Sequence, residues 1–371
     1  MEDRKWAEEI WKRLSAKFEK VAARNEDKLP GICIDGRYDD RRETNITSWT
    51  NGFWGGLMWV LYAGTDNEIF KRTAERSEEL LDAAFLKYDW LHHDTGFMWH
   101  ITAGADYKLT GNQSSYLRNM YAANILAGRY KIKGGYIRAW KGEEKEGYSI
   151  IDTMMNLAQL YWASDMTGDN RYKDIAMAHA DMTMKCHIRP DGSVHHIVNH
   201  NPDTGEVIEY LAGQGMAVGS SWSRGQAWAI YGFVLSYIHT GKSEYLDVAK
   251  RVAHYFIAAV CEDYLPRCDF RSPEELVYYD STAGAVAACG LLEIAKQVPE
   301  YEKELYRRAA MRLLQSMEIN FCDWNQDVDA VLTMGTTAYG DNAVKNIPII
   351  YGDYFFAEAI YKCIGGNILF W

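Results

Sequence analysis

Several features are scarce or missing in this sequence. The 371 residues include seven prolines and no Pro/Gly/Ser-rich linker. We therefore expect one domain spanning residues 1–371, although the length also allows two or three. No run of about 18 uninterrupted apolar residues occurs, so we expect no membrane-spanning helix. The N-terminal MEDRKWAEEIWKRL lacks the apolar core of a signal peptide, and we expect none.

Paired cysteines and a basic surplus are missing too. The seven cysteines are scattered, odd in number and contain no CxxC pair. This pattern favours reduced thiols and a cytoplasmic location over a disulfide framework. The net charge of −11 argues against a nucleic-acid partner or an anionic membrane surface, because either would require a basic footprint.

Aromatic residues, by contrast, are abundant, with 25 Tyr, 13 Trp and 12 Phe. Such rings build cores, and they also offer flat faces to sugars or bases. Hydrophobic residues make up 48% of the chain and charged residues 25%, which is typical of a folded globular protein.

A recurring pattern organises the chain. An aromatic-rich apolar run, a short Thr/Gly turn and a charged amphipathic run follow one another several times. The turns are AGTDNEIF (63–70), LTGNQSSY (109–116), MTGDNRY (166–172) and HTGKSEY (239–245). Each supplies a Gly for a helix C-cap and an Asp, Asn or Ser for the next helix start. The irregular spacing excludes a short solenoid repeat, and helical hairpins remain.

Twelve helices in six hairpins would form a closed all-α ring. We predict them at 3–24, 51–64, 67–88, 94–110, 113–131, 149–166, 169–187, 223–240, 243–262, 280–297, 300–319 and 351–364. Strand signals are few, and they lie at 32–38, 194–200 and 207–211. We expect these strands in loops on one face of a helical barrel.

A polar stripe interrupts the apolar segment IIDTMMNLAQLYW (150–162). Asp152, Asn156 and Gln159 are spaced i, i+4, i+7, which places them on one helix face. A solvated face would normally carry Lys and Glu pairs, so the lumen of a barrel is favoured over solvent.

Two further segments place tryptophans where a ligand could meet them. SSWSRGQAWAIYG (220–232) sets Arg224 between Trp222 and Trp228, which suits a carboxylate-bearing ring, although a core Trp pair explains the pattern as well. In SWTNGFWGGLMW (48–59), Trp49 precedes the expected helix and could reach a cavity mouth.

The segment LHHDTGFMWH (91–100) leaves three interpretations of Asp94 open. A helix cap is plausible because Asp often precedes a turn or helix. A metal site is weaker, because helical zinc sites use i, i+4 histidines and the side chains of His92 and His93 should point in different directions. A catalytic carboxylate is the third. Asp94 and Asp152 both have aromatic or apolar surroundings, and glycosidic chemistry commonly uses two carboxylates.

Taken together and in order, the motifs resemble glycoside hydrolase family 88, the unsaturated glucuronyl hydrolases. The resemblance runs from about residue 45 to the C-terminus through SWTNGFWGG, HHDTGF, RAW, IIDTMMNL, VHHI, SSWSRGQAWAIYGF, YYDSTAGAVAACGLLEIA and YGDYFFAEA. It implies an (α/α)6 barrel that acts on lyase-generated oligosaccharides ending in a C4=C5 unsaturated uronate. The implied reaction hydrates this double bond and needs no metal or organic cofactor.

The resemblance also implies roles for individual residues. Asp152 matches the general acid/base, which must hold a proton near neutral pH, and Asp94 matches the second essential carboxylate. Other residues match substrate contacts: Trp49, His93, Trp140, His196, Gln214, Trp222, Arg224 and Trp228. His195 competes with His196 for the histidine position, and alignment back from NPDTG (201–205) favours His196.

Departures from the family pattern leave substrate preference open. Asn51 stands where many relatives carry an acid, and YGDY (351–354) replaces their W-G-D-Y. The stretch GTTAYGDNAVKNIP (335–348) has only Lys345 as a cation, where some relatives that use sulfated substrates carry a Ser/Lys cluster. Alternatives are a family 105 unsaturated rhamnogalacturonyl hydrolase, an N-acylglucosamine 2-epimerase-like barrel and a non-enzymatic sugar-binding barrel. The polysaccharide source and the oligomeric state are not predicted.

Overall fold

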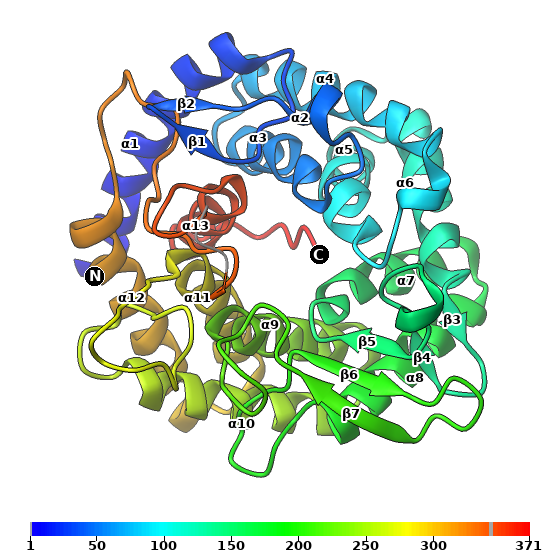
Figure 1. Ribbon diagram of the computed structural model, residues 1–371. Helices are drawn as coiled ribbons and strands as arrows, with labels where there is room; N and C mark the ends of the chain where they lie inside the picture. Colours follow the sequence, from blue (N-terminus) through cyan, green and yellow to red (C-terminus); the bar gives the residue numbers. More distant parts are fainter. Residues whose placement is uncertain (1, 341–343) are drawn as a thin grey trace.

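The computed structural model describes residues 2–340 and 344–371, which form a ring of helices around a filled centre (Figure 1). Six helical segments form the inner wall, and each packs against the next until the last meets the first. They are α3 (Gly52–Thr65), the π-helix η3 (Gly96–Gly104) with its continuation α5 (Ala105–Thr110), α7 (Thr153–Thr167), α9 (Ser223–Thr240), α11 (Ser281–Gln297) and α13 (Ile350–Cys363).

An outer helix covers each inner segment. The outer helices are α4 (Glu68–Phe85), α6 (Gln113–Ala127), α8 (Asn170–Cys186), α10 (Ser243–Val260), α12 (Glu300–Phe321) and α1 (Glu2–Asn25), which packs on α13. Inner helices are apolar almost all round because they are buried on every side, whereas outer helices bury one stripe. The six pairs form the (α/α)6 barrel that the hairpin pattern predicts, and the two ends of the chain supply the closing pair.

The turn chemistry is confirmed at two of the four Thr/Gly turns. Gly111 and Gly168 take left-handed C-cap conformations, and Asn112 and Asp169 cap the helices that follow. At the fourth turn Gly241 also caps α9, but Lys242 holds the N-cap of α10 without a side-chain bond.

At the first turn the predicted N-cap is confirmed, because Asn67 caps α4, but the predicted Gly C-cap is wrong. Asp66 takes the left-handed position, and Gly64 lies inside α3. A Cβ on Gly64 would come within 2.3 Å of the Trp11 ring, so close packing against α1 explains this glycine.

Three small antiparallel sheets lie in the loops. Two are hairpins, β1 (Cys33–Ile34) with β2 (Arg37–Tyr38) and β3 (Tyr130–Lys131) with β4 (Tyr136–Ile137). The third has the order β5 (Tyr148–Ile150), β6 (Ile197–His200), β7 (Val207–Leu211).

Two predicted boundaries need correction here. Residues 149–150 belong to β5 and not to a helix, because they pair with β6, and the strand predicted from 194 begins at Ile197. A short apolar run does not distinguish a strand from a buried helix by periodicity alone.

The short helical turns are α2 (Arg41–Thr44), η1 (Trp49–Asn51), η2 (Tyr88–Trp90) and η4 (Glu143–Lys145). Within the described ranges, none of the helices combines the length and the apolar character that crossing a membrane requires.

Candidate active site

A cavity of about 230 Å³ lies at the end of the barrel where the inner helices begin. Its walls bring together seven of the ten residues singled out from the sequence. The lining is Trp49, His92, His93, Asp94, Trp140, Ile150, Asp152, His196 and Gln214. Trp49 precedes α3 and Asp152 precedes α7, so helix N-termini and their partial positive charge face this space.

Asp152 is held in the cavity wall with one carboxylate oxygen left unpaired. It occupies the N-cap position of α7, yet its side chain makes no capping hydrogen bond. Its Oδ2 atom is buried and has no hydrogen-bond partner in residues 2–340 and 344–371. A buried, unpartnered carboxylate oxygen is costly for stability, which is a common feature of catalytic groups.

The small sheet sets His196 beside Asp152. β5 ends at Ile150 and β6 begins at Ile197, and the ladder continues where the Ile151 amide donates to the His196 carbonyl at 3.1 Å. This pairing leaves His196 Nε2 3.4 Å from Asp152 Oδ2.

The ring orientation of His196 is fixed from its other nitrogen. The backbone amide of Gln214 donates to His196 Nδ1 at 2.9 Å. A neutral His196 ring therefore carries its hydrogen on Nε2, which faces Asp152. Gly213, in the left-handed conformation, allows this approach, because a Cβ there would lie 1.9 Å from His196 Nδ1. The competing His195 stacks on Tyr210 outside this cavity, so the structure places His196 at the site as the alignment favoured.

Asp94 lies among the side chains of Asn156, His92 and His93. Asn156 Nδ2 donates to Asp94 Oδ1 at 3.1 Å. His92 Nδ1 and His93 Nε2 lie 3.2 and 3.4 Å from Asp94 Oδ2. The expectation that the two neighbouring histidines point apart is therefore wrong, because the turn before η3 folds both rings toward one carboxylate. If Asp94 were a helix cap, its side chain would accept a hydrogen bond from the backbone amide of Phe97. That amide donates instead to Asn156 Oδ1, at 2.8 Å.

Burial controls the charge of these groups. It raises the pKa of the Asp94 carboxyl, against the opposing hydrogen bond from His92, and the nearby Asp152 carboxylate raises it further. Burial also lowers the pKa of His93 well below its usual range, so this ring is neutral at pH 7. His93 Nδ1 in turn hydrogen-bonds Thr153 Oγ1 at 2.7 Å.

The polar stripe on α7 is buried, which excludes the solvated face, but its contacts are with the η3 segment and the outer helix α6. Asn156 and Gln159 are fully buried. Gln159 accepts from Thr95 and donates to Asn119 Oδ1 at 2.8 Å. The stripe therefore anchors η3 against α7 and fixes Asp94 relative to Asp152. A π-helix at this point is typical of functional sites.

His92, His93 and Asp94 could also hold a metal ion, since their ligand atoms all lie within 4.8 Å of one another. Long hydrogen bonds from two imidazoles to one carboxylate fit the same geometry. A chelation experiment separates the two possibilities.

Three predicted contact residues lie outside the cavity lining. Trp228 is fully buried against Phe97 and Phe355. Trp222 is buried and packs on the His196 ring, with centroids 4.3 Å apart.

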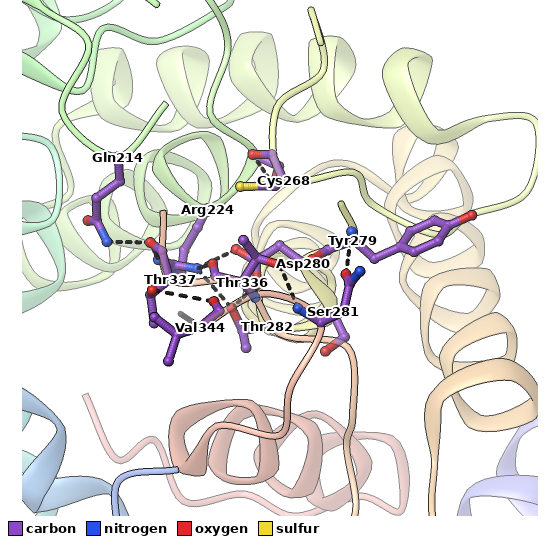
Figure 2. A network of polar contacts seen from close by, with 12 residues as sticks. Gln214, Arg224, Cys268, Tyr279, Asp280, Ser281, Thr282, Thr336, Thr337 and Val344 are labelled. Atoms are coloured by element: carbon purple, nitrogen blue, oxygen red, sulfur yellow. Dashed lines mark hydrogen bonds and ion pairs between the residues drawn. The ribbon is translucent and has the colours of Figure 1, made fainter. Parts of the chain in front are cut away.

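Arg224 forms a buried ion pair with Asp280 (Figure 2). Its guanidinium also donates to the carbonyls of Thr336 and Thr337 at 2.8 and 2.6 Å. Gln214 Nε2 donates to the same Thr337 carbonyl at 2.5 Å, so Arg224 supports a residue that lines the cavity (Figure 2). A direct ion pair between Arg224 and a substrate carboxylate stays a prediction.

Sequence reasoning missed His92 and Ile150 as lining residues, and it did not find the role of Asn156 as the anchor of Asp94. For Asn156 a signal was present in the polar stripe. For His92 the HHD motif did not show which of two adjacent histidines faces inward, and in the structure both do.

The comparisons with known proteins point to one family. No protein-family model matches the chain. The chain is 34% identical over 333 residues to the unsaturated glucuronyl hydrolase of Bacillus sp. strain GL1, covering 88% of each protein. It is 32% identical over 334 residues to the unsaturated chondroitin disaccharide hydrolase of Streptococcus pneumoniae, covering 88% of this chain and 84% of that one.

Solved structures give the same result. The crystal structure of the Bacillus sp. GL1 unsaturated glucuronyl hydrolase superposes with a TM-score of 0.91 at 32% identity, over 96% of this chain and 97% of that one. An Asp-to-Asn variant of the Streptococcus agalactiae enzyme, complexed with dGlcA-GalNAc6S, superposes with a TM-score of 0.82 at 27% identity, over 97% and 93%.

Proposed function

The chain belongs to the unsaturated glucuronyl hydrolases of glycoside hydrolase family 88, and from this premise we propose how its cavity works. The substrate is an oligosaccharide whose non-reducing end is a C4=C5 unsaturated uronate. The enzyme adds a proton to C4 and water to C5. The resulting hemiketal opens to an α-keto acid and releases the remaining saccharide.

Asp152 acts as the general acid and base. Its unpaired Oδ2 delivers a proton to C4 of the ring and then accepts a proton from the water that attacks C5. Protonation makes C5 electron-poor, and the neighbouring ring oxygen shares the positive charge. The observation that carries this assignment is the buried, unpartnered Asp152 Oδ2 in a cavity that also contains Asp94.

Asp94 and His196 support this chemistry. Asp94 accepts hydrogen bonds from the sugar's hydroxyl groups. It also stabilises the positive charge that develops at C5, because preorganised groups in a buried site act strongly on a transition state. His196 Nε2 lies 3.4 Å from Asp152 Oδ2 and packs against the carboxylate without a hydrogen bond to it. Trp49 and Trp140 offer ring faces to the sugar, and His93 and Gln214 offer polar contacts.

A family 105 or epimerase-like activity finds no support among the relatives. We further propose that residues 1–371 work as one catalytic domain, because the main cluster of buried apolar side chains draws on helices from α1 to α13. A cytoplasmic location is also a proposal, and the seven free cysteines support it.

An ultraviolet assay tests the function. The C4=C5 bond conjugated to the carboxylate absorbs, and hydration removes the band. The protein is mixed with unsaturated disaccharides from chondroitin, hyaluronan, heparin and pectin digests, with and without EDTA. Loss of absorbance on a glucuronyl substrate, unaffected by EDTA, is the expected result. An EDTA-sensitive loss would assign a metal to His92, His93 and Asp94, and no loss on any substrate would contradict the proposal.

A further inference from the structure

A second cavity, of about 320 Å³, adjoins the first. His92 and Trp140 line both, so the two spaces share a wall. The remaining residues come from two loops, and they are Asp89, Trp90, Leu91, Lys141 and Lys145. If the unsaturated ring fills the first cavity, the rest of a linear oligosaccharide has to continue into a neighbouring space, and this one is next to it.

The two loops are fixed relative to each other. Arg129 donates to the Leu91 carbonyl at 3.2 Å and to the Ala139 carbonyl at 3.0 Å, which joins the loop before His92 to the loop before Trp140. The His93 amide also donates to the Ala139 carbonyl, at 3.3 Å. The walls of the second cavity are therefore preorganised, which reduces the ordering cost of binding.

The lining combines aromatic rings with cations. The Trp90 side chain, at the end of η2, is 65% exposed, which is unusual for a large apolar ring outside a binding surface. Lys141 Nζ lies 4.3 Å from the centre of the Trp90 ring, and Lys145 Nζ lies 5.9 Å from the Trp140 ring. Cation–π attraction of this kind holds both ammonium groups at the cavity.

These two cations face little local neutralisation. Lys141 forms no ion pair within the described part of the chain, and the nearest acid to Lys145 is Glu144, with Oε1 3.6 Å from Nζ. Asp89 is the acid in the lining, and it can accept a hydrogen bond from a sugar hydroxyl. Two lysines beside the site of a protein with net charge −11 are thus a local exception.

We propose that this second cavity is a subsite for the saccharide that is released, and that Lys141 and Lys145 bind an anionic substituent on it. The substituent is a sulfate ester on the second sugar or a carboxylate on the third. This inference rests on the proposed function and adds a substrate class to it.

The test is the kcat/KM of the double variant Lys141→Gln/Lys145→Gln on matched substrates. They are unsulfated, 4-sulfated and 6-sulfated unsaturated chondroitin disaccharides, and the unsaturated hyaluronan disaccharide and tetrasaccharide. We expect kcat/KM to fall roughly fivefold on the substrates with a second anionic group, either the sulfated disaccharides or the tetrasaccharide, which is the scale of two partly exposed ion pairs. It should be unchanged on the unsulfated disaccharides. Salt should reduce the wild-type preference in the same way.

Two further variants complete the design. Trp90→Ala should raise KM on every substrate, because the ring serves sugars of any charge. Lys133→Gln is the matched control: Lys133 is exposed, pairs with Asp203 and lines neither cavity, so its substitution should change no ratio.

Each outcome decides the inference. A loss confined to sulfated disaccharides assigns the sulfate, and a loss confined to the tetrasaccharide assigns the carboxylate. An unchanged substrate ratio in the double variant, with an active wild type, overturns the subsite and leaves the proposed function standing. A wild type inactive on all substrates overturns both.

Discussion

The two ends of the barrel bury similar acidic side chains and partner them differently. At the end where the inner helices begin, Asp94 and Asp152 lie among imidazoles and an amide, and the described lining of this cavity contains no Lys or Arg. Toward the other end, Glu293 of α11 and Glu358 of α13 share the buried ammonium of Lys362, at 2.5 and 3.3 Å.

The end of the chain fills that second region. The C-terminal tail runs into the middle of the ring (Figure 1), where the Trp371 ring stacks on Phe355 and its Nε1 donates to Glu358 Oε2 at 3.1 Å. Tyr231 also hydrogen-bonds Glu358. The carboxylates there pair with lysine ammonium groups, whereas the carboxylates at the cavity have no such partner in its described lining.

The largest effect is expected from a substitution at the end of the barrel that contains Asp152. Asp152→Asn should lower kcat by roughly three orders of magnitude, since general acid–base catalysis is worth about 10² to 10⁴. The amide keeps the shape of the side chain but carries no transferable proton, so substrate binding should persist. Stopped assays give kcat, and calorimetry with the unsaturated disaccharide gives binding. Normal turnover in this variant would refute the mechanism.

Removing the ion pairs of Lys362 at the other end should lower the stability of the protein and leave kcat unchanged. Lys362→Met leaves the buried Glu358 without a cation and leaves Glu293 with only the half-exposed Lys296, which should cost about 3 kcal/mol of the free energy of unfolding. Denaturant unfolding measures this loss, and kcat per folded molecule should match the wild type. Lys303→Met is the control, since Lys303 makes only an exposed pair with Glu300. A large drop in kcat with unchanged stability would show that the two ends are not separate in function.

A third variant tests the buried ion pair that supports the cavity wall. Arg224→Ala should raise KM about tenfold, equivalent to about 1.4 kcal/mol, because the Thr337 carbonyl that orients Gln214 loses its support. If this is the route, Gln214→Ala and the double variant should show nearly the same KM, as expected for coupled residues. Additive effects would instead favour a direct grip on the uronate, and a pure loss of kcat would place Arg224 in the transition state.

The smallest expected effect is on the pH dependence of stability. The folded pKa of Asp94 is raised, so its stability contribution is full below the unfolded pKa near 3.8 and is lost as pH rises through the folded pKa. The folded pKa of Glu293 is lowered, so its contribution is present above about 4.5 and is lost as pH falls through the folded pKa.

Replacing each acid by its amide should therefore act in opposite directions. At pH 7 Asp94→Asn should stabilise the protein, and Glu293→Gln should destabilise it. Thermal unfolding of both variants from pH 4 to 8 measures the difference. Equal slopes of stability against pH in the two variants would contradict the contrast between the two ends.

Much of the fold followed from local patterns in the sequence. The inner and outer helices alternate as the Thr/Gly turns predicted, and most boundaries agree within a few residues because capping residues mark them. The errors arose where tertiary contacts prevailed. Ser149 and Ile150 continue an apolar helical pattern, yet they pair with β6. Gly64 resembles a C-cap, yet packing against Trp11 requires it.

The sequence by itself determined the helical ring, the acid pair and the family, because periodicity, capping and motif order are properties of neighbouring residues. It did not determine which polar groups meet. Only the tertiary structure turned His92 and His93 toward one carboxylate, set His196 beside Asp152 and committed Arg224 to Asp280. The last two pairings join residues 44 and 56 positions apart, so the closed ring, not local sequence, sets their distances.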